Sequence, residues 1–364
     1  MRITFSTKKG WTLVYIVALL KVTYFIYYQS NIEGTVFGGG NDADYYNAYA
    51  LGYASYADAV NSWPTLLRFL NEIGFYNRYI ITWIIFVTSL TLVPYLYYKV
   101  VRIQDEKIEP VMVVSIFLII FYPTIFYLTI DIYREVFMFC FFLLSLQLYK
   151  KNLESSQVKS KIYFMVYLGI AFLLYFLRPY LGFALAITPF VYLIFSKTKR
   201  YFKTWIILYF VTLVLLKIFG GIDQILLYRE NFAMFSGGKS TIGIGLIDKN
   251  PIMFLVYYFY SIMTQMFGLF FINISSLIVF LLETIPFIMA LIYLRKNIRF
   301  MSKFTSFLLT FFVIYSTIWL LGNDNLGTAV RLRIPSYMVI FASMLIVYQT
   351  KIVAGYEKIK GRRV

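Results

Sequence analysis

Long apolar runs, separated by short polar and basic segments, follow one another along the whole chain. Ten runs have about the length at which a helix crosses the ~30 Å hydrocarbon core of a bilayer. They lie near 11–28, 79–98, 111–128, 132–149, 162–177, 181–195, 204–219, 276–294, 304–321 and 334–350. A further apolar stretch occupies 252–272. The pattern predicts an all-α polytopic membrane protein in which 1–364 form a single membrane domain.

Basic clusters at alternate connections determine the expected topology. They are Lys8 and Lys9; Lys99, Arg102 and Lys107; Lys150, Lys151, Lys159 and Lys161; Lys197, Lys199, Arg200 and Lys203; Arg295, Lys296, Arg299 and Lys303; and Lys351, Lys358, Lys360, Arg362 and Arg363. Since basic loops remain inside, we expect both termini in the cytoplasm. The two larger loops, 29–78 and 220–251, then lie on the outer face.

The stretch 252–272 is in conflict with this rule. If it crossed the membrane, the basic segment 295–303 would move to the outer face, where lysine and arginine are disfavoured. We therefore expect an interfacial or re-entrant helix at 252–272 and ten crossings in total. Eleven crossings is the alternative.

Composition supports a membrane protein and excludes several function classes. Of the 364 residues, 60% are hydrophobic, and the net charge of +17 follows from the basic connections, so no nucleic-acid partner is expected. The chain has no histidine, which excludes Ser-His-Asp catalysis and the usual zinc sites. The one cysteine, Cys140, excludes an intrachain disulfide.

Arginine is concentrated away from the cytoplasmic clusters. With Arg2 included, those clusters hold 23 basic residues, of which 7 are arginine, whereas arginine provides 7 of the other 11. Cytoplasmic charge needs only to be positive, but a guanidinium binds phosphate or carboxylate through two parallel hydrogen bonds. The enrichment indicates anion recognition at the outer face.

Four of these arginines lie at the ends of apolar runs: Arg134, Arg178, Arg331 and Arg333. A charge at that depth must be paired or must face a water-filled cavity. Internal salt bridges or contacts to lipid headgroups are the alternative explanation. We infer a cavity, open to the outer leaflet, that holds an anionic group such as a lipid diphosphate. Pro335 is expected to start the last span, and Arg229 in the second outer loop is a candidate lid contact to substrate.

The first outer loop combines acidic and aromatic residues. A glycine run at 38–40 leads to Asp42 and Asp44 in "FGGGNDADYY", and an amphipathic helix is expected to follow. Either aspartate is a candidate general base or metal ligand, and Asp44 is also a candidate helix cap. Tyr45 and Tyr49 offer aromatic faces to sugars, or belong to an interfacial aromatic belt.

The stretches "NDADYY", "REV", "LRPYLG" and "GTAVRLRIPSY" resemble Wzy-type O-antigen and capsule repeat-unit polymerases, bacterial glycosyltransferases with a GT-C-like architecture. The resemblance implies an enzyme of the inner membrane that joins undecaprenyl-diphosphate-linked oligosaccharides at the periplasmic face. Membrane lipids and a chain-length regulator protein are the other implied partners. No cofactor is expected, although a divalent metal remains an option.

The resemblance also implies roles for individual residues. Arg178, Arg331 and Arg333 would bind the diphosphate, and Asp42 or Asp44 would act as base. Arg134 with Glu135 would position the acceptor, or would be adjacent residues without direct mutual contact on a helix. Asp324 and Asn325 would contact sugar.

Two other functions fit parts of the pattern. A GT-C enzyme that uses a polyprenyl-phosphate sugar would depend strictly on metal and transfer single sugars. A flippase for lipid-linked oligosaccharides would carry repeats and charges at the midplane. The chain has no visible repeat, and its charges gather at one face, which favours an enzyme.

Overall fold

The structure is a computed structural model that describes residues 7–30, 42–103, 109–196, 202–236, 241–247, 249–271 and 273–360. In this part of the chain the regular elements are helices, and one isolated β-bridge pairs Thr241 with Asn325. The helices are α1 (Thr7–Ser30), α2 (Asp42–Ala50), η1 (Tyr56–Asp58), α3 (Ser62–Glu72), α4 (Arg78–Leu90), α5 (Leu92–Val101), α6 (Glu109–Phe121), α7 (Pro123–Tyr127), α8 (Glu135–Glu154), α9 (Gln157–Leu177), α10 (Pro179–Ser196), α11 (Phe202–Ile218), α12 (Asp223–Ser236), α13 (Pro251–Ser261), the π-helix η2 (Ile262–Met266), α14 (Ile274–Val279), the π-helix η3 (Phe280–Thr284), α15 (Ile285–Lys296), η4 (Ile298–Phe300), α16 (Lys303–Gly322) and α17 (Leu326–Lys360).

Seven helical segments among the described residues are long and apolar enough to cross a membrane. They are Thr7–Ser30, Arg78–Val101, Glu135–Glu154, Gln157–Leu177, Ile274–Lys296, Lys303–Gly322 and Leu326–Ala354. Each coincides with one of the predicted apolar runs. The prediction of an all-helical, multi-pass membrane protein is therefore confirmed.

The other three predicted runs do not form simple spans. The run 111–128 is broken at Tyr122, because the residue before a proline is disfavoured in a helix and Pro123 starts the next one. The run 181–195 forms a short helix, and α11 is bent by 76° against α12. Length and composition thus support seven spans among the described residues, or eight with the bent pair. The count of ten stays a prediction.

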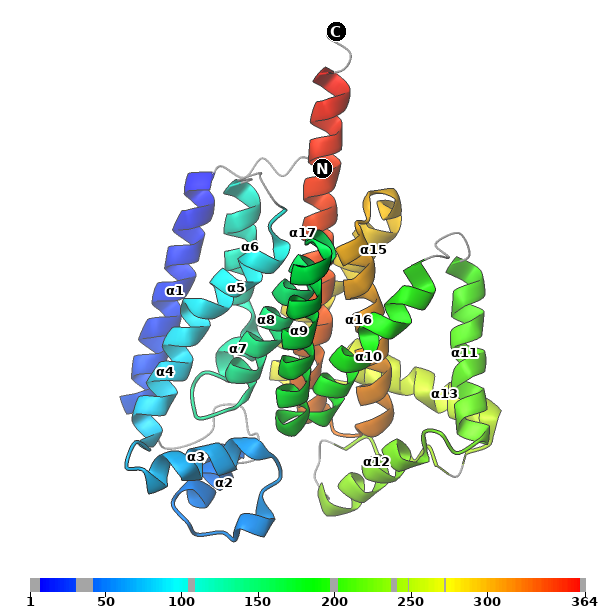
Figure 1. The fold of residues 1–364 in the computed structure, drawn as a ribbon. Helices are drawn as coiled ribbons and strands as arrows, with labels where there is room; N and C mark the ends of the chain where they lie inside the picture. The colour runs from blue at the N-terminus through cyan, green and yellow to red at the C-terminus, as the bar shows by residue number, and fades with distance from the viewer. Residues whose placement is uncertain are drawn as a thin grey trace.

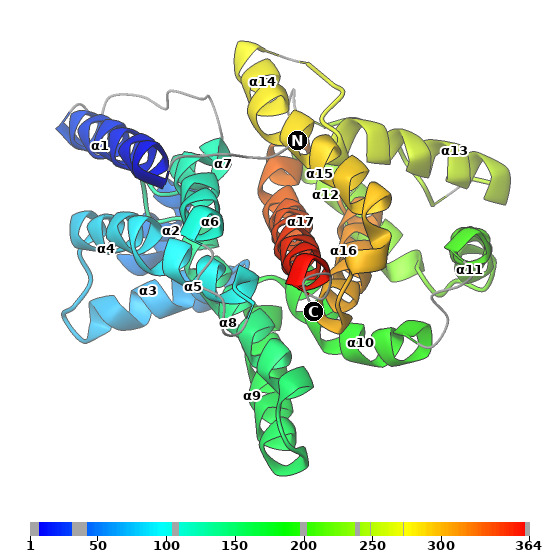
Figure 2. The same cartoon turned by 90° about the horizontal axis from the view of Figure 1, so that it is seen from above.

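The last helix, α17, runs through the centre of the molecule (Figures 1 and 2). Of its most apolar part, 83% is buried by the other helices. The expectation that Pro335 starts this span was wrong, since α17 begins at Leu326 and holds Pro335 in its interior. Arg331 and Arg333 therefore lie on the second turn of a central helix instead of in a surface turn.

The helices of the two predicted outer loops gather at one end of the bundle. Figure 1 shows α2, α3 and α12 at the end opposite to the start of α1 and the end of α17. In both views α13 runs across the bundle, and the interfacial or re-entrant placement of 252–272 stays a prediction (Figures 1 and 2). The side of the membrane that each end faces stays a prediction. The glycine run 38–40, Arg2, Lys107, Lys197, Lys199, Arg200, Arg362 and Arg363 lie outside the described residues.

Candidate functional site

The end of α9 and the start of α8 meet in a buried ion pair. Arg178 ends α9 because Pro179 starts α10, and Glu135 is the first residue of α8. The Arg178 Nη2 atom lies 3.0 Å from Glu135 Oε1, and the two side chains are only 8% and 5% exposed. The ion pair thus joins two helix ends whose residues are 43 positions apart in the sequence.

Arg331 of α17 joins this pair to the outer helix α2. Its Nη1 atom lies 4.0 Å from Glu135 Oε1 and forms a salt bridge with Asp42. Its guanidinium also lies over the Tyr133 ring, 5.3 Å from the ring centroid. Glu135 is buried, whereas the Asp42 side chain is 47% exposed, so Asp42 is the partner that can leave without a large desolvation cost.

Arg134 completes this group, which we call the arginine cluster: Arg134, Arg178, Arg331, Glu135 and Asp42. Arg134 lies close enough to Glu135 to attract it, and to the other two arginines to repel them. Three guanidinium groups and two carboxylates leave a net charge of +1. Departure of Asp42 would raise it to +2. The cluster is therefore suited to exchange Asp42 for an external anion.

The cluster is not saturated with hydrogen bonds. Arg134 Nε and Glu135 Oε2 are buried without a partner in the described part of the chain. A cavity of about 20 Å³, the size of one water molecule, lies between Glu135, Arg178 and Arg331, with Tyr315 and Pro335 in its wall. Buried polar groups are usually satisfied, so these free atoms indicate a ligand or water position.

Two phenols border the cluster. Tyr133 faces Arg331, and Tyr46 lies on the buried side of α2. Burial raises the pKa of both hydroxyl groups, so both remain protonated at neutral pH and can donate hydrogen bonds. The sequence interpretation missed both residues, because they have no distinguishing spacing among the 34 tyrosines.

The two aspartates of the D-x-D pattern have different partners. Asp44 binds Arg78 at 2.8 Å, and Arg78 also contacts both carboxylate oxygens of Asp131 at 3.0 and 2.5 Å. Asp42 and Asp44 are thus divided between two arginines. The described residues contain no group of three His, Cys, Asp or Glu side chains arranged to hold a metal ion.

Tyr45 and Tyr49 hold the first outer loop together. The Tyr45 hydroxyl donates to the Asp58 carbonyl oxygen at 2.6 Å. The Tyr49 hydroxyl donates to the Tyr56 carbonyl oxygen at 3.1 Å, and its side chain is fully buried. These contacts favour the structural explanation for both tyrosines over a sugar platform.

Arg229 lies in a separate, fully paired site. Its guanidinium is 1% exposed and binds Asp324 Oδ1 at 2.6 Å. It also donates to the Ile244 and Leu320 carbonyl oxygens and to Ser261 Oγ, at 2.9–3.1 Å. Asn325 accepts from Thr328 N at 3.0 Å and so caps α17. The contacts of Arg229, Asp324 and Asn325 fix the start of α17 against α12.

Arg333 faces away from the arginine cluster. Two residues along a helix turn the side chain by about 200°, so Arg331 and Arg333 point to opposite sides of α17. Arg333 is buried against Tyr337 and Gly268, and a Cβ atom at Gly268 would lie only 2.7 Å from the Arg333 Nη1 atom. The Arg333 Nε and Nη1 atoms have no hydrogen-bond partner among the described residues. The expected joint clamp of Arg178, Arg331 and Arg333 does not assemble.

Glu283 is the acidic neighbour of Arg333 that the sequence interpretation missed. It is fully buried in the π-helix η3, and its Oε1 accepts from Thr124 N at 2.8 Å and Thr124 Oγ1 at 2.5 Å. Glu283 Oε2 has no partner in the described residues. The sequence did contain a signal for Glu283, which is the one acidic residue in the apolar run 276–294. An ionisable residue within a membrane span usually has a function.

Comparison with protein-family models, with curated proteins and with solved structures finds no match to this chain.

Proposed function

We propose that this protein is a Wzy-type polymerase that joins lipid-diphosphate-linked oligosaccharide repeat units at the outer face of the bacterial inner membrane. The observation that carries the proposal is the arginine cluster. It combines three guanidinium groups, a buried carboxylate, unsatisfied polar atoms and one exposed, exchangeable acid. Both cytoplasmic termini, ten crossings and a GT-C-like architecture belong to the same proposal.

In the proposed reaction a sugar hydroxyl of the acceptor attacks the anomeric carbon of the donor chain. A new C–O bond forms, the bond from that carbon to the lipid diphosphate breaks, and the diphosphate leaves with the bonding electron pair. Arg331, Arg178 and Arg134 would stabilise the negative charge that develops on the leaving oxygen. Glu135 would hold Arg178 and Arg331 in position, since it contacts both.

The hydroxyl proton needs an acceptor near the cluster. Asp42 would be released from Arg331 when diphosphate binds, which makes it available as a general base. Asp44 is less suited, because it is bound to Arg78 and is not in contact with the cluster arginines in any described pair. A metal ion is not needed for charge neutralisation if three guanidinium groups meet the diphosphate.

A reaction with purified protein in detergent tests this proposal. The substrate is undecaprenyl-diphosphate-linked repeat unit from the host, and products are separated on a gel with and without EDTA. We expect a ladder that EDTA does not affect and that Arg331→Lys strongly weakens, because lysine cannot bind phosphate with two parallel hydrogen bonds.

The other two functions give different results in the same preparation. Transfer of single sugars that stops with EDTA would support a polyprenyl-phosphate-sugar enzyme. Transbilayer movement of the lipid in vesicles, without a ladder, would refute the polymerase and support a flippase.

A further inference from the structure

A second feature of the chain lies away from the arginine cluster, within the membrane-spanning part of α1. Lys21 is 14 residues from the start of α1 and 9 residues from its end. At 1.5 Å per residue the ammonium-bearing residue is about 13 Å from the nearer end of the helix. That is close to half of the ~30 Å hydrocarbon thickness, so Lys21 lies near the middle of the membrane.

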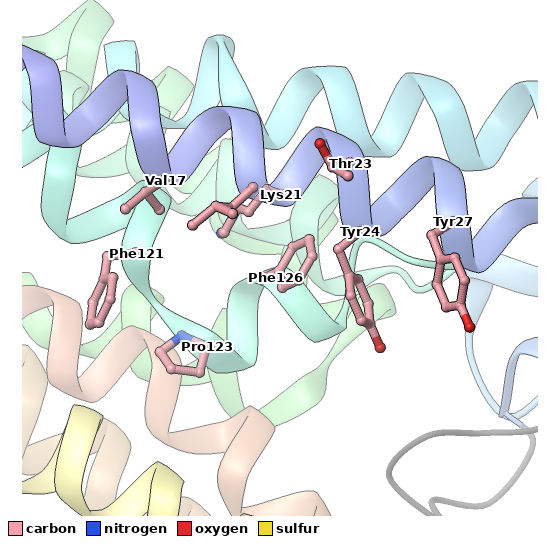
Figure 3. Close-up of a pocket in the computed structure, with 9 residues that line it drawn as sticks. Val17, Lys21, Thr23, Tyr24, Tyr27, Phe121, Pro123 and Phe126 are labelled. Atoms are coloured by element: carbon pink, nitrogen blue, oxygen red, sulfur yellow. The ribbon is translucent and has the colours of Figure 1, made fainter.

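Lys21 borders a large apolar cavity between α1 and the break between α6 and α7. The cavity has a volume of about 620 Å³. Figure 3 shows Lys21 on the face of α1 that looks towards Phe121, Pro123 and Phe126, with Val17 beside it. Six residues of α1 line the cavity, and all except Thr23 recur at the helical spacing that forms one continuous face: Val17, Leu20, Lys21, Tyr24 and Tyr27.

The helix break explains why this cavity exists. Nearer the start of α1, Val14 packs directly against Val113 and Ile120 of α6. Beyond Phe121 the chain leaves the helix at Tyr122 and turns at Pro123. Past this point α6 no longer runs beside this face of α1, and the gap remains open along it, while Phe25 on another face of α1 stacks on Phe86 of α4.

No described carboxylate compensates the charge of Lys21. The side chain is 8% exposed, and its Nζ atom lies 4.6 Å from the centroid of the Phe126 ring. No hydrogen bond or ion pair of Lys21 occurs within the described residues, whereas Lys217 and Lys150 both have one. A cation–π contact alone is a weak substitute for a counter-ion in an apolar surrounding.

We propose that this cavity, which we call the Lys21 groove, is a docking site for a transmembrane helix of a partner protein that carries an aspartate or glutamate near mid-membrane. Ionisable groups inside a membrane pair with one another, and Lys21 is a buried amine without an ion-pair partner among the described residues in the apolar wall of the groove. A phospholipid headgroup lies at the interface, about 13 Å from Lys21 along α1, and is therefore the less suitable anion.

A second copy of this chain does not fit the site. Glu283 is the acidic residue deepest within a candidate span of the described chain, and it is fully buried. The partner is therefore a different protein. This inference does not depend on the proposed polymerase activity.

The test uses the full-length protein in phosphatidylcholine vesicles with a labelled synthetic span of leucine and alanine. One peptide carries aspartate at its centre, and the matched control carries leucine there. We expect energy transfer to show about fivefold tighter association of the aspartate peptide, a value typical of polar pairs between membrane helices. Lys21→Met should abolish the preference, and Lys21→Arg should retain it.

Two results would overturn the proposal. In the first, both peptides associate equally with the natural protein, which would mean that the groove does not select an acid. In the second, Lys21→Met leaves peptide binding unchanged but lowers the amount of phosphatidylglycerol that copurifies, which would assign the groove to an anionic lipid. Methionine is chosen because its unbranched apolar side chain resembles the stem of lysine. Size-exclusion chromatography is the control that each variant remains folded.

Discussion

Two buried arginine sites in this protein contain similar side chains but differ in how many of their polar atoms have a hydrogen-bond partner. Arg229 uses all three of its nitrogen atoms in contacts with Asp324, Ser261 and two carbonyl oxygens. The arginine cluster leaves Arg134 Nε and Glu135 Oε2 without partners, and its link to Asp42 is half exposed. Because unsatisfied buried polar groups cost free energy, the difference separates a structural arginine from arginines that are prepared for a ligand.

The largest effect is expected at the saturated site. Arg229→Ala leaves Asp324 buried and unpaired, which costs about 3–5 kcal/mol of stability. We expect a strongly lowered Tm in detergent and little folded protein. Arg229→Met combined with Asp324→Leu removes both charges and should recover much of the loss. A single variant with an unchanged melting curve would show that the pair is not structural.

Arg331→Lys should have the opposite profile. The cluster is already incompletely bonded, so we expect little change of Tm. Polymer formation should fall by about 10²–10³-fold, as is typical when a preorganised donor to a developing charge is lost. Initial rates of ladder formation and a melting curve on the same preparation measure both effects. A large drop in Tm with normal rates per folded molecule would reverse the comparison.

Asp42→Asn separates exchange from catalysis. It removes the exposed partner of Arg331, and a partly exposed ion pair contributes roughly 0.2–1 kcal/mol. We therefore expect lipid diphosphate to bind up to about fivefold more tightly, while the catalytic rate falls because the base is lost. Binding of a non-reactive lipid diphosphate, measured by fluorescence, tests the first part. Weaker binding would mean that Asp42 itself holds the substrate.

Asp44→Asn should have the smallest effect. Arg78 keeps both contacts to Asp131 when Asp44 is neutralised, so we expect a stability change below about 0.5 kcal/mol and nearly normal ladder formation. Rates measured beside those of Asp42→Asn make a matched pair on the same helix. A severe loss of rate in Asp44→Asn alone would move the base from Asp42 to Asp44.

The sequence by itself determined the membrane class and most of the spans. Apolar runs of bilayer length have one stable outcome, since every backbone polar group in the hydrocarbon core must be bonded within a helix. The concentration of arginine at span ends also indicated that Arg134, Arg178 and Arg331 matter, and the structure brings these three together. The apolar runs and the arginines at their ends depend on residues close together in the chain, whereas the meeting of these three arginines does not.

Only the tertiary structure decided which charges meet. That Asp42 pairs with Arg331 and Asp44 with Arg78 depends on how α2 packs on the bundle, over sequence separations of 289 and 34 residues. The opposite directions of Arg331 and Arg333 follow from the early start of α17 at Leu326, which the nearby Pro335 concealed in the sequence. The unpaired Lys21 was likewise visible only once the break at Pro123 had opened a cavity beside it. Local pattern fixes helices and their depth, whereas contacts between distant helices fix the partners of each charge.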